Sequence, residues 1–234
     1  MGTLEGPGIR YVVFLQGCPL RCLFCHNPDT WRRRAGREVD VDDILRDVAG
    51  YRPFLDASGG GITCTGGEPL GQSDFVAELF SRARKIGIHT AIDTSGFAEL
   101  SDSVRRVLEE TDLVLLDIKH VEEEAHRELT GVSFERIERF ARFVDASPAR
   151  LWIRHVLVPT VTLEAGALSA TSEFVAALRS VERVDLLPYH ELGRHKWEAL
   201  GRRYPLENIA PPSRDEVYAA YEVFKRAGLP VTKP

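Results

Sequence analysis

Three cysteines that lie close together in the sequence are the residues most clearly suited to chemistry. Cys18, Cys22 and Cys25 follow one another with the spacing C-x3-C-x2-C. They come directly after residues 9–16, a run rich in β-branched and aromatic side chains that we expect to form a buried strand. The sequence therefore predicts three thiols on one loop at the C-terminal end of a strand, where α/β sheets and barrels place their reactive groups.

Three thiolates on one loop could hold different groups. A structural zinc site needs four ligands, so His26 or Cys64 would have to complete it. A disulfide would leave one of the three thiols unpaired. Cysteine thiolates also bind iron–sulfur clusters, and a four-iron cluster with only three cysteine ligands leaves one iron open to a substrate or cofactor. We expect a catalytic cluster of this kind, because a passive electron carrier would use four ligands.

The composition limits the class of protein. The chain has 234 residues and a net charge of -5. This charge argues against a protein that binds nucleic acid through overall positive charge, although Arg32, Arg33, Arg34 and Arg37 form one local basic cluster. No apolar stretch is long enough to span a membrane, and no secretory signal is visible. We expect a monomeric, cytoplasmic protein that binds neither nucleic acid nor membrane.

Runs typical of strands alternate with amphipathic helical segments along the chain. We expect strands at 9–16, 62–65, 89–93, 113–119, 151–158 and 184–188, and helices at 41–51, 73–86, 101–110, 168–178 and 213–227, with further helical segments up to 144. Strands that alternate with helices predict a parallel sheet with right-handed crossovers. Because a closed β/α barrel has eight units, we expect a single α/β domain over residues 1–234, folded as an open, partial barrel of six units.

The cysteine spacing after the first strand of such a barrel resembles the radical S-adenosylmethionine (SAM) superfamily. In that superfamily the methionine part of SAM chelates the open iron, and one electron cleaves the cofactor to a 5′-deoxyadenosyl radical. Other motifs along the chain resemble a family within it, the pyruvate formate-lyase activating enzymes. They are EGPGIR at 5–10, CHNPDTW at 25–31, the glycines at 59–61 and 66–67 with Glu68, DTSG at 93–96, LDIK at 116–119, WIR at 152–154 and LPYHELG at 187–193.

The resemblance implies a site built from residues at the strand ends. Cys18, Cys22 and Cys25 would be the catalytic cysteines that bind a 4Fe-4S cluster. SAM would be contacted by Phe24, Cys25, His26, Gly66, Gly67, Glu68, Asp93, Asp117, Ile118, Lys119 and His190. A Na⁺ or K⁺ ion would be bound by Asp93, Thr94 and Asp117, since oxygen donors suit hard cations. Glu5 and Arg154 would lie near a substrate peptide.

Several of these residues also have a structural interpretation. Asp93 and Thr94 could cap a helix. An ion pair between Asp117 and Lys119 is an alternative to cofactor binding. Cys64 is expected to be a small buried hydrophobic side chain rather than a ligand.

The resemblance implies an oxidoreductase that abstracts a hydrogen atom from a glycine of a partner, with pyruvate formate-lyase as the expected partner and flavodoxin or ferredoxin as electron donor. Glu5 stands where these activating enzymes typically have aspartate, so an activase of another glycyl radical enzyme is an alternative. Many of those activases carry a cysteine-rich insert, whereas residues 27–66 contain only Cys64. A radical SAM enzyme that acts on a small molecule is a second alternative, and a passive iron–sulfur electron carrier is a third.

Overall fold

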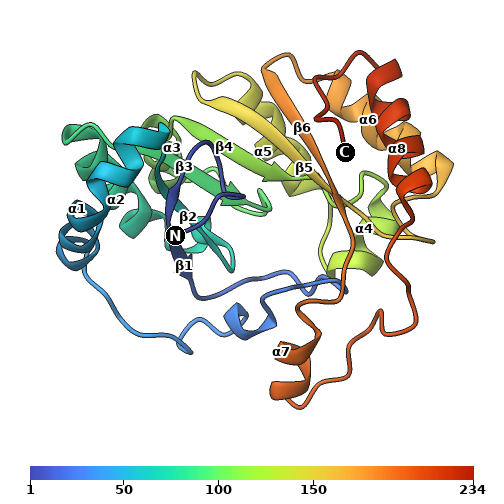
Figure 1. Cartoon of the computed structure of the whole chain (residues 1–234), viewed down its shortest axis with the longest axis horizontal. Helices are drawn as coiled ribbons and strands as arrows, with labels where there is room; N and C mark the ends of the chain where they lie inside the picture. The colour runs from blue at the N-terminus through green and yellow to red at the C-terminus, as the bar shows by residue number, and fades with distance from the viewer.

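The computed structural model describes all 234 residues and contains one parallel sheet of six strands (Figure 1). The strands are β1 (Arg10–Leu15), β2 (Gly61–Gly66), β3 (His89–Thr94), β4 (Leu113–Asp117), β5 (Arg150–Leu157) and β6 (Val181–Pro188). They lie in the sheet in chain order, and β1 does not pair with β6. The predicted open barrel of six β/α units is therefore confirmed.

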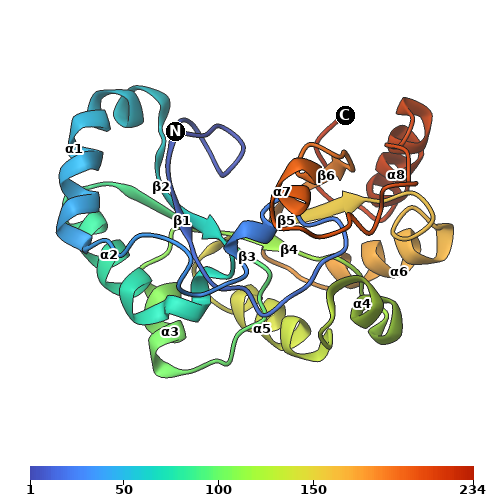
Figure 2. The same cartoon turned by 90° about the horizontal axis from the view of Figure 1, so that it is seen from below.

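Helices follow the strands and cover one side of the curved sheet. They are α1 (Val41–Ser58), α2 (Ser73–Lys85), α3 (Asp102–Glu109), α4 (Glu123–Thr130), α5 (Glu135–Asp145), α6 (Ala165–Ala176), α7 (Arg194–Ala199) and α8 (Arg214–Arg226), with short 3-10 helices η1 (Pro28–Thr30) and η2 (Pro69–Gln72). Figure 2 shows α1 to α6 and α8 in an arc around the sheet, with α7 apart from them. None of the helices combines the length and apolar character needed to cross a membrane.

The alternation of side chains along the strands separates the core from the inner face of the barrel. On β4, Val114 and Leu116 belong to the main hydrophobic core beneath the helices. Leu113 and Leu115 face the other way, in a small cluster with Trp152 of β5. Each such buried aliphatic side chain stabilises the fold by about 1.5–3 kcal/mol. The apolar contacts therefore fix the register of the strands, and with it the positions of the polar residues at their C-terminal ends.

Strand β1 differs from the expectation of a buried strand. It has a neighbour on only one side, because the barrel is open, and the Phe14 side chain is 53% exposed. Its other edge pairs only at Arg10, through an isolated antiparallel bridge to Gly2. The β-branched and aromatic composition indicated a strand correctly but could not indicate that it lies at an edge.

Some element boundaries also differ from the prediction, and one short helix was not predicted. Helix α1 continues past Tyr51 and through Pro53, and ends only where Gly59 takes a left-handed conformation with φ of 65°. Strand β4 ends at Asp117, two residues earlier than predicted. Helix α7 was not predicted, because it is only six residues long and has too few turns to show a helical periodicity.

Candidate functional site

The cysteine loop, residues 17–26, leaves the C-terminal end of β1 and is held by backbone hydrogen bonds on both sides. Gly17 N–H donates to the carbonyl of Thr30 at 2.7 Å, which ties the loop to η1. Arg21 N–H donates to Thr130 O at 2.7 Å, which ties it to the end of α4. Cys22 is buried, Cys18 and Cys25 are half-buried, and all are free thiols. The loop is thus ordered by main-chain contacts that do not depend on a disulfide.

Burial controls the ionisation of these thiols. It raises the pKa of Cys18 to about 11 and that of Cys22 to about 12, and it also raises the pKa of Cys25. The positive charge of Lys119 acts in the opposite direction on all three cysteines. The thiols are therefore protonated at neutral pH until a metal displaces the protons, so that metal binding releases protons.

Helix α7 closes over the end of the cysteine loop. Trp197 Nε1–H donates to the carbonyl of Cys25 at 2.8 Å, and the Trp197 ring meets Trp31 edge-on with ring centres 5.0 Å apart. Just before the helix, the ring of His190 stacks on that of His26 at 4.3 Å. The ring of His26 also donates from Nε2 to the His190 carbonyl at 3.1 Å. The role of Trp197 was not predicted, although it stands close to the motif at 187–193.

Gly66 and Gly67, at the C-terminal end of β2, allow the chain to pass directly against the cysteine loop. Gly67 N–H donates to Leu15 O at 2.8 Å, and Glu68 N–H donates to Gly17 O at 2.8 Å. A Cβ atom at residue 67 would lie 2.4 Å from Gly17 O, which is too close for any side chain. Gly66 has a φ of 106°, a conformation that L side chains rarely adopt. This segment therefore requires glycine for a close approach of two backbones.

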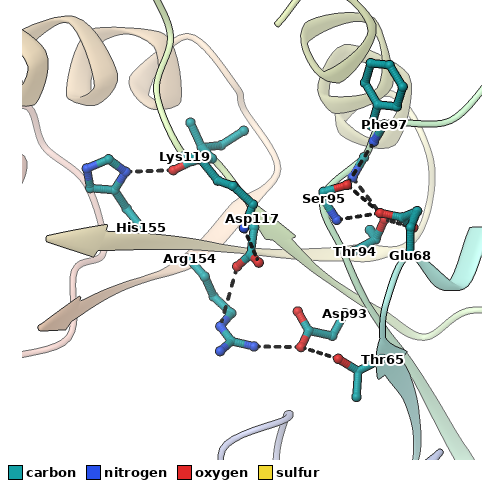
Figure 3. A network of polar contacts seen from close by, with 12 residues as sticks. Thr65, Glu68, Asp93, Thr94, Ser95, Phe97, Asp117, Lys119, Arg154 and His155 are labelled. Atoms are coloured by element: carbon teal, nitrogen blue, oxygen red, sulfur yellow. Dashed lines mark hydrogen bonds and ion pairs between the residues drawn. The ribbon is translucent and has the colours of Figure 1, made fainter. Parts of the chain in front are cut away.

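The Glu68 side chain joins the ends of β2 and β3. Its Oε1 accepts hydrogen bonds from Leu70 N–H at 3.0 Å and from the Thr94 hydroxyl at 2.6 Å. Its Oε2 accepts from Ser95 N–H at 2.9 Å and from the Ser95 hydroxyl at 2.5 Å (Figure 3). Burial raises the pKa of Glu68, and these four donors oppose that shift. Four donors use the lone-pair positions of a carboxylate, so Glu68 already has a structural role.

A buried ion-pair network crosses the inner face of the barrel (Figure 3). Asp93 Oδ2 accepts from the Thr65 hydroxyl at 2.8 Å and from Arg154 Nη1 at 2.9 Å. Arg154 Nε lies 3.8 Å from Asp117 Oδ1, and Lys119 Nζ lies 3.0 Å from Asp117 Oδ2. We call these five residues the ion-pair network. It links the ends of β2 to β5 and contains two carboxylates and two cations.

The charges of the network determine its ionisation and connect it to the cysteines. Asp93 raises the pKa of Arg154. Burial alone would raise the pKa of Asp117, but Lys119 and then Arg154 outweigh it and lower that pKa. Lys119 Nζ also lies 5.4 Å from the centre of the Phe24 ring, within cation–π range. A single ammonium group thus faces both the network and the cysteine loop.

These residues fit an iron–sulfur cluster with a chelating cofactor. Three free thiols lie on one loop beside an ammonium group, and glycine backbone without side chains borders the loop. No three His, Cys, Asp or Glu side chains converge on a point where they would bind one metal ion. Three free cysteines on one loop suit a cluster, because each cysteine of a cluster binds a different iron.

Comparison with known proteins identifies the family. The model of the Radical SAM superfamily matches residues 12–168. The pyruvate formate-lyase 1-activating enzyme of Escherichia coli K12 is 43% identical over 228 residues, which cover 97% of this chain and 93% of that protein. The pyruvate formate-lyase-activating enzyme of Staphylococcus epidermidis is 46% identical over 239 residues, which cover 99% and 95%. This chain belongs to the pyruvate formate-lyase activating enzyme family. The resemblance inferred from the sequence motifs is thereby confirmed.

The family also appears among solved structures. A domain of the pyruvate-formate lyase-activating enzyme from Bacteroides vulgatus superposes with a TM-score of 0.63 at 27% identity, covering 74% of this chain and 98% of that domain. As a member of this family, the chain is a radical SAM enzyme with the corresponding 4Fe-4S cluster and SAM.

In this fold, most of the predicted site residues lie together at the C-terminal ends of the strands. The rings of His26 and His190 stack on each other, and Lys119 Nζ lies 3.0 Å from Asp117 Oδ2. The predicted ion pair between Asp117 and Lys119 is therefore present. Thr94 does not cap a helix, since its hydroxyl donates to Glu68 and accepts from Gly96 N–H at 2.9 Å.

The remaining predicted residues lie around this centre. The backbone carbonyl of Glu5 accepts from the Thr63 hydroxyl at 2.7 Å, and the Glu5 charge contributes to raising the pKa of Arg154. The carbonyl of Ile118 accepts from His155 Nδ1–H at 2.7 Å. Cys64 is fully buried in the main hydrophobic core, where burial raises its pKa. Its surroundings are those of a small hydrophobic side chain, as the sequence predicted.

Proposed function

We propose that this protein activates pyruvate formate-lyase by abstracting a hydrogen atom from a backbone glycine of that enzyme. The observation that supports this most strongly is the 43–46% identity to pyruvate formate-lyase activating enzymes over nearly the whole chain. The three free thiols on the loop after β1 provide the ligands that this chemistry requires. When bound, the cluster and SAM supply a 5′-deoxyadenosyl radical.

Each residue of the site has a distinct task in this proposal. Cys18, Cys22 and Cys25 hold the cluster, and Lys119 offsets negative charge beside it. Gly67 lets the backbone approach the cysteine loop. SAM is placed against the strand ends, where the expected contacts are Phe24, His26, Gly66, Gly67, Glu68, Asp93, Asp117, Ile118, Lys119 and His190. Helix α7 packs over the loop, and we expect it to limit the access of water to this face.

A monovalent cation is a further part of the proposal. Asp93, Thr94 and Asp117 supply oxygen atoms at adjacent strand ends. In the structure these carboxylates already pair with Arg154 and Lys119, so a Na⁺ or K⁺ ion has to displace one of these contacts. We expect the affinity for SAM to be higher in Na⁺ or K⁺ than in a tetramethylammonium buffer, measured by isothermal titration calorimetry. Equal affinities in all three buffers would exclude the cation.

We also propose that the whole chain forms one domain and acts as a monomer in the cytoplasm. Arg154 and Glu5 would contact the glycine-bearing segment of pyruvate formate-lyase, and flavodoxin or ferredoxin would supply the electron. The glutamate at position 5 supports one second candidate, an activase of another glycyl radical enzyme.

Anaerobic reconstitution tests the proposal. The protein is loaded with iron and sulfide, reduced with dithionite and mixed with SAM and pyruvate formate-lyase. We expect release of 5′-deoxyadenosine and a glycyl radical doublet in the electron paramagnetic resonance spectrum. Release of 5′-deoxyadenosine without the doublet would mean that the partner is a different glycyl radical enzyme. Absence of 5′-deoxyadenosine would refute the radical mechanism.

A further inference from the structure

A basic surface lies on the outer side of the cysteine loop. It consists of six exposed arginines, none of which forms an ion pair: Arg21, Arg32, Arg33, Arg34, Arg37 and Arg202. Most other arginines on the surface pair with a carboxylate, for example Arg46 with Asp43 and Arg142 with Glu138. The chain as a whole has a net charge of -5, so a cluster of six arginines without carboxylate partners is a local excess of positive charge. The function proposed above leaves it unused.

The basic surface contacts the backbone at Cys18, the first of the three cysteines. Arg21 Nη1 donates to the carbonyl of Cys18 at 2.7 Å. Arg33 lies against Gly17, with its Cγ 3.2 Å from where a Cβ of residue 17 would be. The guanidinium groups of Arg21 and Arg202 lie 4.9 and 5.5 Å from the centre of the Trp31 ring. Positive charge thus surrounds the outer side of Cys18.

An open cleft of about 1040 Å³ continues this surface along the unpaired edge of β1. Its lining includes the exposed Phe14 and Arg33, Arg34 and Arg37. Figure 1 shows the chain leaving β1, turning back and reaching α1, and the returning segment contacts the cysteine loop through Cys18 N–H, which donates to Trp31 O at 3.4 Å.

The acidic residues in the same cleft neutralise only part of this charge. Asp43 pairs with Arg46 at 2.8 Å, and Asp47 accepts a hydrogen bond from the Tyr11 hydroxyl. Glu38 is the remaining carboxylate in the lining. The cleft and the basic surface together therefore keep an excess of positive charge.

We propose that the basic surface docks a small acidic electron-carrier protein. This inference rests on the proposed function, which needs one electron for each SAM cleaved. One electron leaves the reduced cofactor of the carrier, which is oxidised, and enters the cluster held by Cys18, Cys22 and Cys25. No atom or proton is transferred. Charge complementarity selects the acidic carrier, and the position beside Cys18 explains why the charge is located there.

Charge reversal tests the docking separately from the chemistry. Arg32→Glu, Arg34→Glu and Arg37→Glu are combined in one variant, because these side chains make no hydrogen bond or ion pair that the fold would lose. Arg214→Glu is the matched control, since Arg214 is exposed and unpaired in the first turn of α8, where an acidic residue is favourable. Equal urea midpoints for the variants and the wild type establish that they fold alike.

The first readout is binding of an acidic flavodoxin to the cluster-free protein by biolayer interferometry. We expect wild-type affinity to weaken as salt rises from about 0.05 to about 0.5 M. The triple variant should bind about tenfold or more weakly, mainly through a slower association rate, while the Arg214→Glu control matches the wild type. Unchanged flavodoxin binding by the triple variant would overturn the proposal. Loss of binding to a DNA oligonucleotide without loss of flavodoxin binding would overturn it in favour of a nucleic-acid site.

The second readout separates the docking from the proposed function. The triple variant should form 5′-deoxyadenosine at the wild-type rate with dithionite, which needs no docking, and more slowly with reduced flavodoxin. Equal rates of the two proteins with flavodoxin would refute the docking. If neither protein forms 5′-deoxyadenosine with dithionite, the proposed function fails, while the binding measurement still decides whether the surface docks an acidic protein.

Discussion

Replacing Arg154 by methionine removes the central cation of the ion-pair network and leaves Asp93 without its partner. The side chains of Arg154 and Asp93 are only 18% and 12% exposed, and their atoms are 2.9 Å apart. Breaking a buried pair from one side costs about 3–5 kcal/mol, and the remaining exposure reduces this to about 2–4 kcal/mol. A loss of this size corresponds to a decrease in Tm of roughly 5–15 °C for a chain of this length.

The same strand provides a matched control. Arg150 of β5 pairs with Glu182 at 2.6 Å, but the two side chains are 50% and 42% exposed. Arg150→Met should therefore change the free energy of unfolding by less than about 1 kcal/mol. Urea unfolding of the cluster-free protein, followed by circular dichroism, measures both variants under the same conditions.

A double variant shows whether the cost comes from the uncompensated carboxylate. Adding Asp93→Asn to Arg154→Met removes that charge, so we expect the double variant to be more stable than Arg154→Met alone. If Arg154→Met is no more destabilising than Arg150→Met, the network contributes little to the fold. If Asp93→Asn adds its own full cost to that of Arg154→Met, the two residues are not coupled, and our explanation of the network is wrong.

Three further predictions concern the cysteines, a glycine and a histidine. Cys22→Ala should abolish 5′-deoxyadenosine formation, whereas Cys64→Ala should retain it and cost about 1 kcal/mol for the lost core volume; an inactive but folded Cys64→Ala protein would contradict this assignment. Gly67→Ala should destabilise the cluster-free protein by about 2 kcal/mol, because its Cβ would meet a carbonyl oxygen at 2.4 Å, whereas Gly50→Ala in open space within α1 should stabilise it slightly in the same urea titration. Burial lowers the pKa of His155 to about 4, so the unfolded state binds its proton more tightly and stability falls as the pH drops below about 6.5. Between pH 7 and pH 4.5 the His155→Gln variant should lose about 2–3 kcal/mol less than the wild type in urea unfolding, and an equal loss would show that another group dominates.

The sequence predicted the architecture well because the β/α alternation is a local property. Hydrophobic periodicity identifies strands such as β3 and β5 and helices such as α2 without knowledge of their neighbours. The edge position of β1 depends instead on how many strands close the barrel, and six leave it open. The exposure of Phe14 therefore could not be inferred from its own segment.

The site was predictable where it consists of one continuous motif and less so where it depends on register. The three cysteines form such a motif, and they lie on one loop as expected. The contact between Asp93 and Arg154 joins strands that are separated by β4, so it depends on the alignment of three strands in the sheet. The hydrogen bond from Trp197 to the Cys25 carbonyl likewise joins two residues that are 172 positions apart in the sequence. No local pattern contains that information.

The transfer of the glycine hydrogen is the central claim, and isotope labelling tests it most directly. Pyruvate formate-lyase labelled with deuterium at both α-positions of glycine is mixed with the reconstituted protein and SAM, and the 5′-deoxyadenosine is analysed by mass spectrometry. We predict one deuterium in the 5′-deoxyadenosine, together with a glycyl radical signal that collapses from a doublet to a singlet because the remaining α-position carries deuterium. Unlabelled 5′-deoxyadenosine formed alongside a glycyl radical would contradict direct abstraction from glycine by this protein.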